Sequence, residues 1–156
     1  MSACIRDPEA GVGGMNHFML PQNASGAWGE DSQSARFGNF AMEKLINELI
    51  KAGGARERLE IKVFGGGNVI EASNAVGSNN ADFVRRYLEA EGLPCAAADL
   101  GGSLPRRIHY YPANGRVVRR LLGVGETSAV TREESDYRNR LRGQKSCGDI
   151  ELFGEN

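Results

Sequence analysis

The stretch LEIKVFGGG, residues 59–67, decides the fold class of this chain. Its first six residues alternate between apolar and polar side chains, which is typical of a β-strand with one buried face. The three glycines that follow predict a turn at the end of this strand. A helix with one apolar face is predicted over residues 80–90, and a strand of small residues over 95–100. A strand, a helix and a second strand in this order predict an α/β structure.

Two further strands are predicted near the N-terminus. The first covers residues 2–6, and residues 7–11 contain the proline and glycine of a turn. A short apolar strand is predicted over residues 15–20, directly after a second turn at Gly13 and Gly14. These two strands supply additional members of the sheet.

The longest predicted helix follows a polar segment. Residues 22–38 mix glycine, serine, asparagine, aspartate and glutamine, a composition that predicts a loop. Asn39 is a good N-cap for a helix that ends near Ala52, before two glycines. Between these two residues the apolar side chains recur at steps of three and four, as expected for one buried helix face.

The C-terminal third of the chain begins with a predicted hairpin. Its strands cover residues 107–111 and 116–122, with Asn-Gly in the turn between them. We therefore predict one layered α/β domain with a mixed sheet over residues 1–123. Residues 124–156 are predicted to be a charged C-terminal extension, with a helix within 132–142 and a short strand near 149–153.

The composition excludes several classes of protein. The chain has 156 residues, 19 basic and 20 acidic side chains, and a formal net charge of -1, which argues against a general binder of nucleic acid or membrane surfaces. No apolar stretch reaches the roughly 18 residues of a membrane span. The N-terminus lacks the basic and apolar regions of a signal peptide, so we expect a cytoplasmic protein.

The cysteines and histidines argue against a metal or disulfide framework. Cys4, Cys95 and Cys147 are an odd number at wide spacing without a CxxC pair, which fits reduced thiols in the cytoplasm. His17 and His109 are the only imidazoles, and no other ligand-type residues cluster around either in the sequence. We expect neither a metal nor an organic cofactor.

Two other patterns have both a functional and a plain structural interpretation. The glycines of residues 65–67 could bind a phosphate group, but the spacing fits neither nucleotide-binding motif, and close backbone packing is favoured. The hairpin carries a basic group with tyrosines beside it, which could bind nucleic acid or protein or could simply face solvent. The arginines of this group are Arg106, Arg107, Arg116, Arg119 and Arg120.

Several motifs resemble those of one known family. Residues 6–21, RDPEAGVGGMNHFMLP, are the most specific of these. Further matches follow in order at residues 36–42, 62–67, 76–80 and 99–102. Together they resemble the bacterial chemoreceptor glutamine deamidases of the CheD family, over about residues 3–122.

This resemblance implies a fold and a reaction. CheD proteins are similar in fold to the catalytic domain of the cytotoxic necrotizing factor toxins. They hydrolyse the side-chain amide of particular glutamines on methyl-accepting chemotaxis receptors, which gives glutamate and ammonia. The implied mechanism uses a cysteine nucleophile and a histidine base, without a metal or organic cofactor. The cytoplasmic part of the receptors and, for some members, the CheC phosphatase are the implied partners.

His17 corresponds to the family histidine, whereas the family cysteine has no counterpart in residues 1–156. The family places that cysteine in a Gly-Ser-Cys motif on the first strand, four residues before a second cysteine that matches Cys4. The nucleophile is therefore expected immediately before Met1, in a first strand that is truncated here. Cys4 lies four residues further along the strand, about 13 Å away, and is a poor substitute. Asn79 and Pro105 also depart from residues common in the family.

Three functions remain open at this stage. The leading one is a chemoreceptor glutamine deamidase whose given chain lacks the nucleophile. An inactive relative that still docks receptors or the CheC phosphatase is the alternative. An unrelated small-molecule enzyme that uses the glycine turn is the weakest of the three.

Overall fold

The computed structural model describes residues 1–20, 33–69, 76–123, 126, 132, 136, 139–140 and 150–154. Its main sheet has five strands in the order β4-β3-β1-β2-β7, and two further strands form a separate hairpin, β5-β6. The strands are β1 (Ser2–Asp7), β2 (Val12–His17), β3 (Glu60–Gly65), β4 (Cys95–Leu100), β5 (Arg106–Tyr111), β6 (Arg116–Leu121) and β7 (Ile150–Gly154). The helices are α1 (Gln33–Lys51), η1 (Arg56–Arg58) and α2 (Val76–Ala90). This arrangement confirms the predicted α/β class and mixed sheet.

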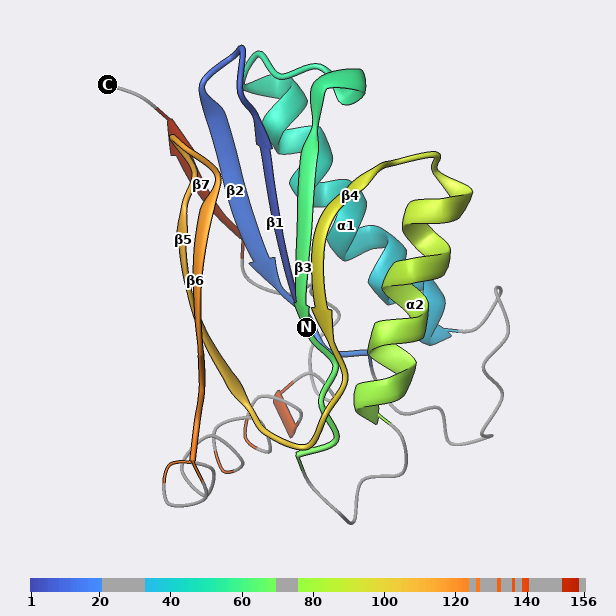
Figure 1. Ribbon diagram of the computed structural model, residues 1–156. Helices are drawn as coiled ribbons and strands as arrows, with labels where there is room; N and C mark the ends of the chain where they lie inside the picture. The colour runs from blue at the N-terminus through green and yellow to red at the C-terminus, as the bar shows by residue number, and fades with distance from the viewer. Residues whose placement is uncertain are drawn as a thin grey trace.

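The chain forms three layers, with the main sheet in the middle (Figure 1). Strand β1 is central and pairs antiparallel with both β2 and β3, while β3 and β4 are parallel. Helices α1 and α2 cover one face of the sheet, and the β5-β6 hairpin covers the other (Figure 1). Strand β7 comes from the segment predicted as an extension, and it pairs with β2.

The main core lies between the sheet and the helices. Alternate residues of β1, Ala3 and Ile5, are fully buried there, because side chains of a strand point to opposite faces in turn. Leu45 and Ile46 of α1 and Val84 of α2 meet them from the helix layer. The other residues of β1, which are Ser2, Cys4 and Arg6, therefore point to the opposite face of the sheet. They lie between the sheet and the hairpin.

Two sequence predictions were wrong at element boundaries. Helix α1 begins at Gln33 rather than Asn39, so residues 33–38 of the predicted loop are helical, and residues 22–32 lie outside the described part. Gly38, one of the glycines of that segment, lies inside the helix, where a Cβ atom would collide with the ring of Phe83. Helix α2 likewise begins four residues before the predicted start, at Val76.

Strand β2 is also displaced from its prediction. It covers 12–17 rather than 15–20, so the glycines predicted to form a turn lie inside the strand. A Cβ atom on Gly13 would lie 2.7 Å from the Cβ of Pro112 in the hairpin loop. Gly13 therefore permits the hairpin to pack closely on the sheet, and the turn falls at residues 8–11, with Gly11 at φ 66°.

Asp7 fixes the turn between β1 and β2. Its side chain is fully buried and lies 2.6 Å from Nη2 of Arg58. One carboxylate oxygen accepts the backbone N–H groups of Glu9 and Ala10, and the other accepts that of Ala55 at 2.8 Å. The hydrogen bond from Arg58 is the main reason why the pKa of Asp7 lies well below its usual range, and the backbone donors lower it further.

Replacing Asp7 with alanine should lower the free energy of unfolding at pH 7 by about 3 kcal/mol, because buried donors lose a charged acceptor. Since the pKa of Asp7 is lower in the folded state, its contribution is present above its unfolded pKa, about 3.9, and is lost as the pH falls further. The difference between parent and variant should therefore shrink from pH 7 toward pH 2. Urea unfolding at several pH values measures it.

Glu9→Ala is the matched control for this experiment. Glu9 lies 3.4 Å from the same guanidinium but is 75% exposed, so its loss should change the unfolding free energy by less than about 0.5 kcal/mol. Equal effects of the two substitutions, or a difference that does not depend on pH, would contradict the role given to Asp7.

Candidate active site

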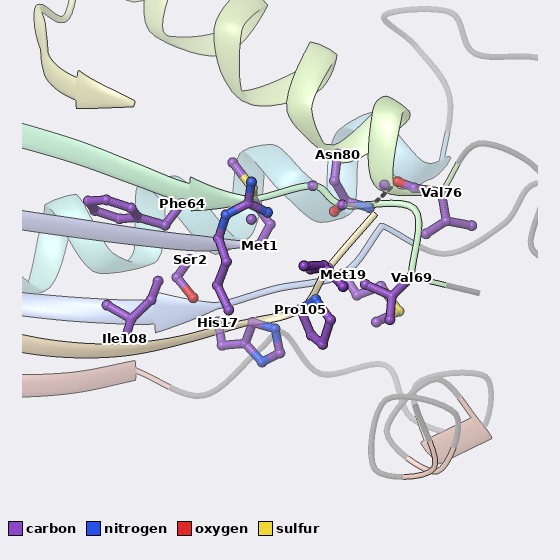
Figure 2. A pocket seen from close by; sticks show the side chains of 16 residues that line it. Met1, Ser2, His17, Met19, Phe64, Val69, Val76, Asn80, Pro105 and Ile108 are labelled. Atoms are coloured by element: carbon purple, nitrogen blue, oxygen red, sulfur yellow. Dashed lines mark hydrogen bonds between the residues drawn. The ribbon is translucent and has the colours of Figure 1, made fainter. Parts of the chain in front are cut away.

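A cavity of about 100 Å³ lies where β2 and β3 end and β1 begins. His17 and Ser2 line it from two neighbouring strands, and Pro105 and Ile108 line it from the hairpin layer (Figure 2). The register pairs Ser2 directly with His17, so both side chains point to the hairpin face of the sheet. The structure therefore places the predicted histidine in a cavity between the two layers.

His17 has an electrostatic environment that favours the neutral imidazole. The positive α-amino group of Met1 and, secondarily, burial lower the pKa of His17 to about 3. At neutral pH the ring is then uncharged and has a lone pair that can accept a proton. This is the protonation state that a general base requires.

The strand pairing continues beyond Ser2. The backbone N–H of Phe18 donates to the carbonyl oxygen of Met1 at 2.9 Å. A residue placed before Met1 in the same strand would point to the face that carries Ser2 and His17, because side chains alternate. It would be a diagonal neighbour of His17, at a Cβ separation of roughly 7 Å or less.

Cys4 does not line this cavity. It is only 1% exposed and lies under the hairpin, opposite Met15 on β2 and Lys62 on β3. Burial raises the pKa of its thiol to about 12, although the nearby Lys62 ammonium acts in the opposite direction. At neutral pH the thiol is therefore protonated, and the attacking species in cysteine chemistry is the thiolate.

Neither of the other two cysteines is among the described residues that line the cavity. Cys95 begins the edge strand β4, is exposed, and directs its Sγ atom to the carbonyl of Ala97. It does not occupy the core position expected of a small hydrophobic residue. Cys147 lies outside the described residues. Among the described residues that line the cavity, there is no cysteine.

The glycine turn after β3 forms one wall of the cavity. A Cβ on Gly66 would lie 2.9 Å from both the Cβ of Ala81 and the carbonyl oxygen of Gly77, at the start of α2. Gly65 and Gly66 also have φ values of 115° and 66°, which side chains disfavour. Close backbone packing, the favoured interpretation of these glycines, is confirmed.

Asn80 holds the segment that follows His17 against α2. Its Oδ1 accepts the backbone N–H of Leu20 at 3.0 Å, and its Nδ2 donates to the carbonyl of Val76 at 2.7 Å. It is buried and lines the cavity. The sequence marked this asparagine only as part of a matching motif, since nothing local in the sequence predicts a contact across 60 residues.

The basic group on the hairpin is divided between two environments. Arg107, Arg116, Arg119 and Arg120 are exposed, and the guanidinium of Arg116 lies 5.9 Å from the ring centre of Tyr111. The side chain of Arg106 is instead only 8% exposed and lines the cavity. The sequence grouped these arginines, because alternation along a strand does not reveal which face meets a cavity.

Metal-ligating clusters and membrane-spanning helices are both absent from the part of the chain that the structure describes. No group of three or more His, Cys, Asp or Glu side chains there could hold a metal ion. None of the helices in the described ranges combines the length and apolar composition that a membrane crossing requires. His109 lies on the exposed face of β5 and is not part of the cavity.

Comparison with known proteins identifies the family. The family model described as CheD chemotactic sensory transduction matches residues 19–121. The chain belongs to the CheD family. This result confirms the resemblance in the sequence motifs, and curated relatives extend it across β1 and His17, which precede the matched range.

Three of these CheD relatives are named "Probable chemoreceptor glutamine deamidase CheD". The protein from Rhodopseudomonas palustris (strain BisA53) is 54% identical over 153 residues, which are 98% of this chain and 72% of the relative. Those from Hahella chejuensis (strain KCTC 2396) and Janthinobacterium sp. (strain Marseille) are 49% and 51% identical, each over 98% of this chain. The alignments cover 73% and 76% of these two relatives.

Proposed function

We propose that this protein is a chemoreceptor glutamine deamidase, in which His17 is the general base. The observation that carries this proposal is the position of the His17 imidazole in the cavity beside the start of β1, on the strand face that it shares with Ser2. The names of relatives about 50% identical over almost the whole chain support the same reaction.

The nucleophile in this proposal is a cysteine immediately before Met1. The strand register supports it, because this position faces the same side of the sheet as His17 and lies diagonally opposite to it. Cys4 lies four residues along the strand from that position and is buried as a protonated thiol. With the upstream cysteine as the attacking group, the reaction needs no second nucleophile from the residues that line the cavity.

The reaction then proceeds through a thioester. The imidazole of His17 takes the proton of the upstream thiol, and the thiolate attacks the carboxamide carbon of a receptor glutamine. The C–N bond breaks, and His17 returns the proton to the departing ammonia. Water, deprotonated by the same imidazole, hydrolyses the thioester to glutamate and restores the thiol. No cofactor takes part in these steps.

The substrates in this proposal are glutamines on the cytoplasmic part of methyl-accepting chemotaxis receptors, so the protein acts in the cytoplasm. A CheC-type phosphatase is the second proposed partner. Mass spectrometry of receptor fragments incubated with the upstream-extended protein tests the activity, since each deamidation converts one glutamine to glutamate. Unchanged receptor fragments in the presence of a folded, extended protein would refute the function and leave the binding module as the alternative.

A double substitution, Cys95→Ser with Cys147→Ser, should leave the deamidation rate of the extended protein within about twofold. Cys95 is exposed on an edge strand away from the cavity, and surface substitutions of this kind have small effects. Ammonia release from receptor fragments measures the rate. Complete loss of activity in a variant with an unchanged circular dichroism spectrum would show that one of these thiols takes part.

A further inference from the structure

Arg106 is held in the wall of the cavity by two acceptors from the end of β4. Its Nη2 donates to the carbonyl oxygen of Gly101 at 2.6 Å and to Oδ1 of Asp99 at 3.1 Å. Gly101 and Gly102 have φ values of 83° and 82°, so the chain turns here in a conformation that favours glycine. These two hydrogen bonds therefore hold Nη2 of the guanidinium against the end of β4.

One buried donor of this guanidinium has no hydrogen-bond partner. The Nε–H of Arg106 has no hydrogen-bond partner and is closed to solvent. A buried donor without an acceptor is destabilising, and such groups are rare in folded proteins. Because the Arg106 side chain lines the cavity, the missing acceptor can be supplied by a bound molecule.

The charge around Arg106 favours an oxygen ligand with negative character. Arg119 lies 2.7 Å from Oδ2 of Asp99, although without hydrogen-bond geometry, so two arginines share one carboxylate. Among the described residues that line the cavity there is no acidic side chain. The site therefore has a surplus positive charge and a free donor, which suit a carboxamide oxygen and suit a carboxylate better.

We propose that Arg106 is a substrate-binding residue that takes the side-chain oxygen of the bound glutamine and, after deamidation, the carboxylate of the product. This inference rests on the proposed function. It adds a contact between the substrate and the hairpin side of the cavity to the contacts with the reacting groups on the sheet. A ligand oxygen reaches Nε only after a local shift of the Arg106 side chain, because this N–H is closed to solvent. Product binding should consequently be tighter than substrate binding.

Three peptides test this assignment with residues 1–156. Each copies one segment of the cytoplasmic part of a chemoreceptor and differs at one position, which is glutamine, glutamate or methionine. Calorimetry should give the tightest binding for the glutamate peptide and the weakest for the methionine peptide, which has no side-chain oxygen. The NMR signal of the Arg106 Nε–H should shift with the first two peptides and not with the third.

Arg106→Gln should weaken binding of the glutamine and glutamate peptides by about tenfold or more and leave the methionine peptide unchanged. If Arg106→Gln does not fold, Arg106→Lys replaces it in the experiment, because lysine retains a positive charge beside Asp99. Lysine has no Nε–H donor of this kind, so this variant should show the same loss of discrimination among the peptides. Arg107→Gln is the matched control, because Arg107 follows Arg106 on β5 but is exposed and does not line the cavity. It should change all three affinities by less than about threefold.

Two results would overturn the inference in distinguishable ways. If the peptides shift the His17 signals while Arg106 and its variants show no preference among them, Arg106 has only a structural role and the proposed function stands. If no peptide shifts any signal from the cavity, both the proposed function and this contact are refuted.

Discussion

Residues 1–156 alone should deamidate receptor glutamines at least about 1,000-fold more slowly than the same chain extended upstream by Gly-Ser-Cys. The extension places a thiol on the strand face that carries His17, whereas Cys4 lies under the hairpin with its pKa raised to about 12. Loss of the nucleophile in cysteine or serine hydrolases removes most of the catalytic rate. Mass spectrometry of receptor fragments gives both rates.

The matched control is the chain extended by Gly-Ser-Ala, which has the same length and the same neutral amide before Met1. It should be as slow as residues 1–156, because only the thiol is missing. Equal rates for the chains with and without the added cysteine would show that Cys4 or another group performs the attack. The position given to the nucleophile would then be wrong.

Replacing His17 with alanine in the extended protein should lower the deamidation rate by about 10²- to 10⁴-fold, the usual contribution of a general base. The imidazole lines the cavity, and few other groups there can accept a proton. Ammonia release measures the effect, and a rate within tenfold of the parent would exclude His17 as the base. Replacing the exposed His109 with alanine is the control and should leave the rate unchanged.

The same histidine should also change its pKa when the chain is extended. The α-amino group of Met1 is the main cause of the low pKa of His17, about 3, and an amide carries no charge. Removing that positive charge stabilises the protonated imidazole, so the pKa should rise toward its ordinary value, about 6.5, while burial keeps it below that value. Activity should then increase with pH through this pKa. NMR titration of both chains measures the shift, and identical values would contradict it.

The sequence predicted the order of strands and helices because hydrophobic alternation and turn residues are local properties. Strand β4 and the two strands of the hairpin were placed within about one residue of their observed bounds. The errors at α1 and β2 both involve a glycine whose role is tertiary. Gly38 is close to the ring of Phe83, and Gly13 to Pro112, and neither contact is visible in the local pattern.

The candidate site was predictable only in part. The motif that contains His17 pointed to the imidazole, but composition and spacing alone would have favoured a core histidine. Arg106 was grouped with the other hairpin arginines, because its contacts are with Asp99 and Gly101 at the end of β4, which the local pattern of the hairpin does not show. The protonated state of Cys4 likewise follows from the hairpin above it and not from its neighbours in sequence.

The hairpin that lies across the sheet has one consequence for access to the cavity. Strands β5 and β6 form a sheet of their own, and in the described ranges no ladder hydrogen bond joins them to the five-stranded sheet. Side chains of β1 and β3 connect the layers instead, where Arg6 donates to Ala113 and Lys62 to Gly115. We expect the hairpin to separate from the sheet as a unit, with a free energy of opening well below that of global unfolding. Its backbone amides should therefore exchange with solvent before those of the central strand. Access to the cavity would then require only this local opening, with the core between the sheet and the helices left intact.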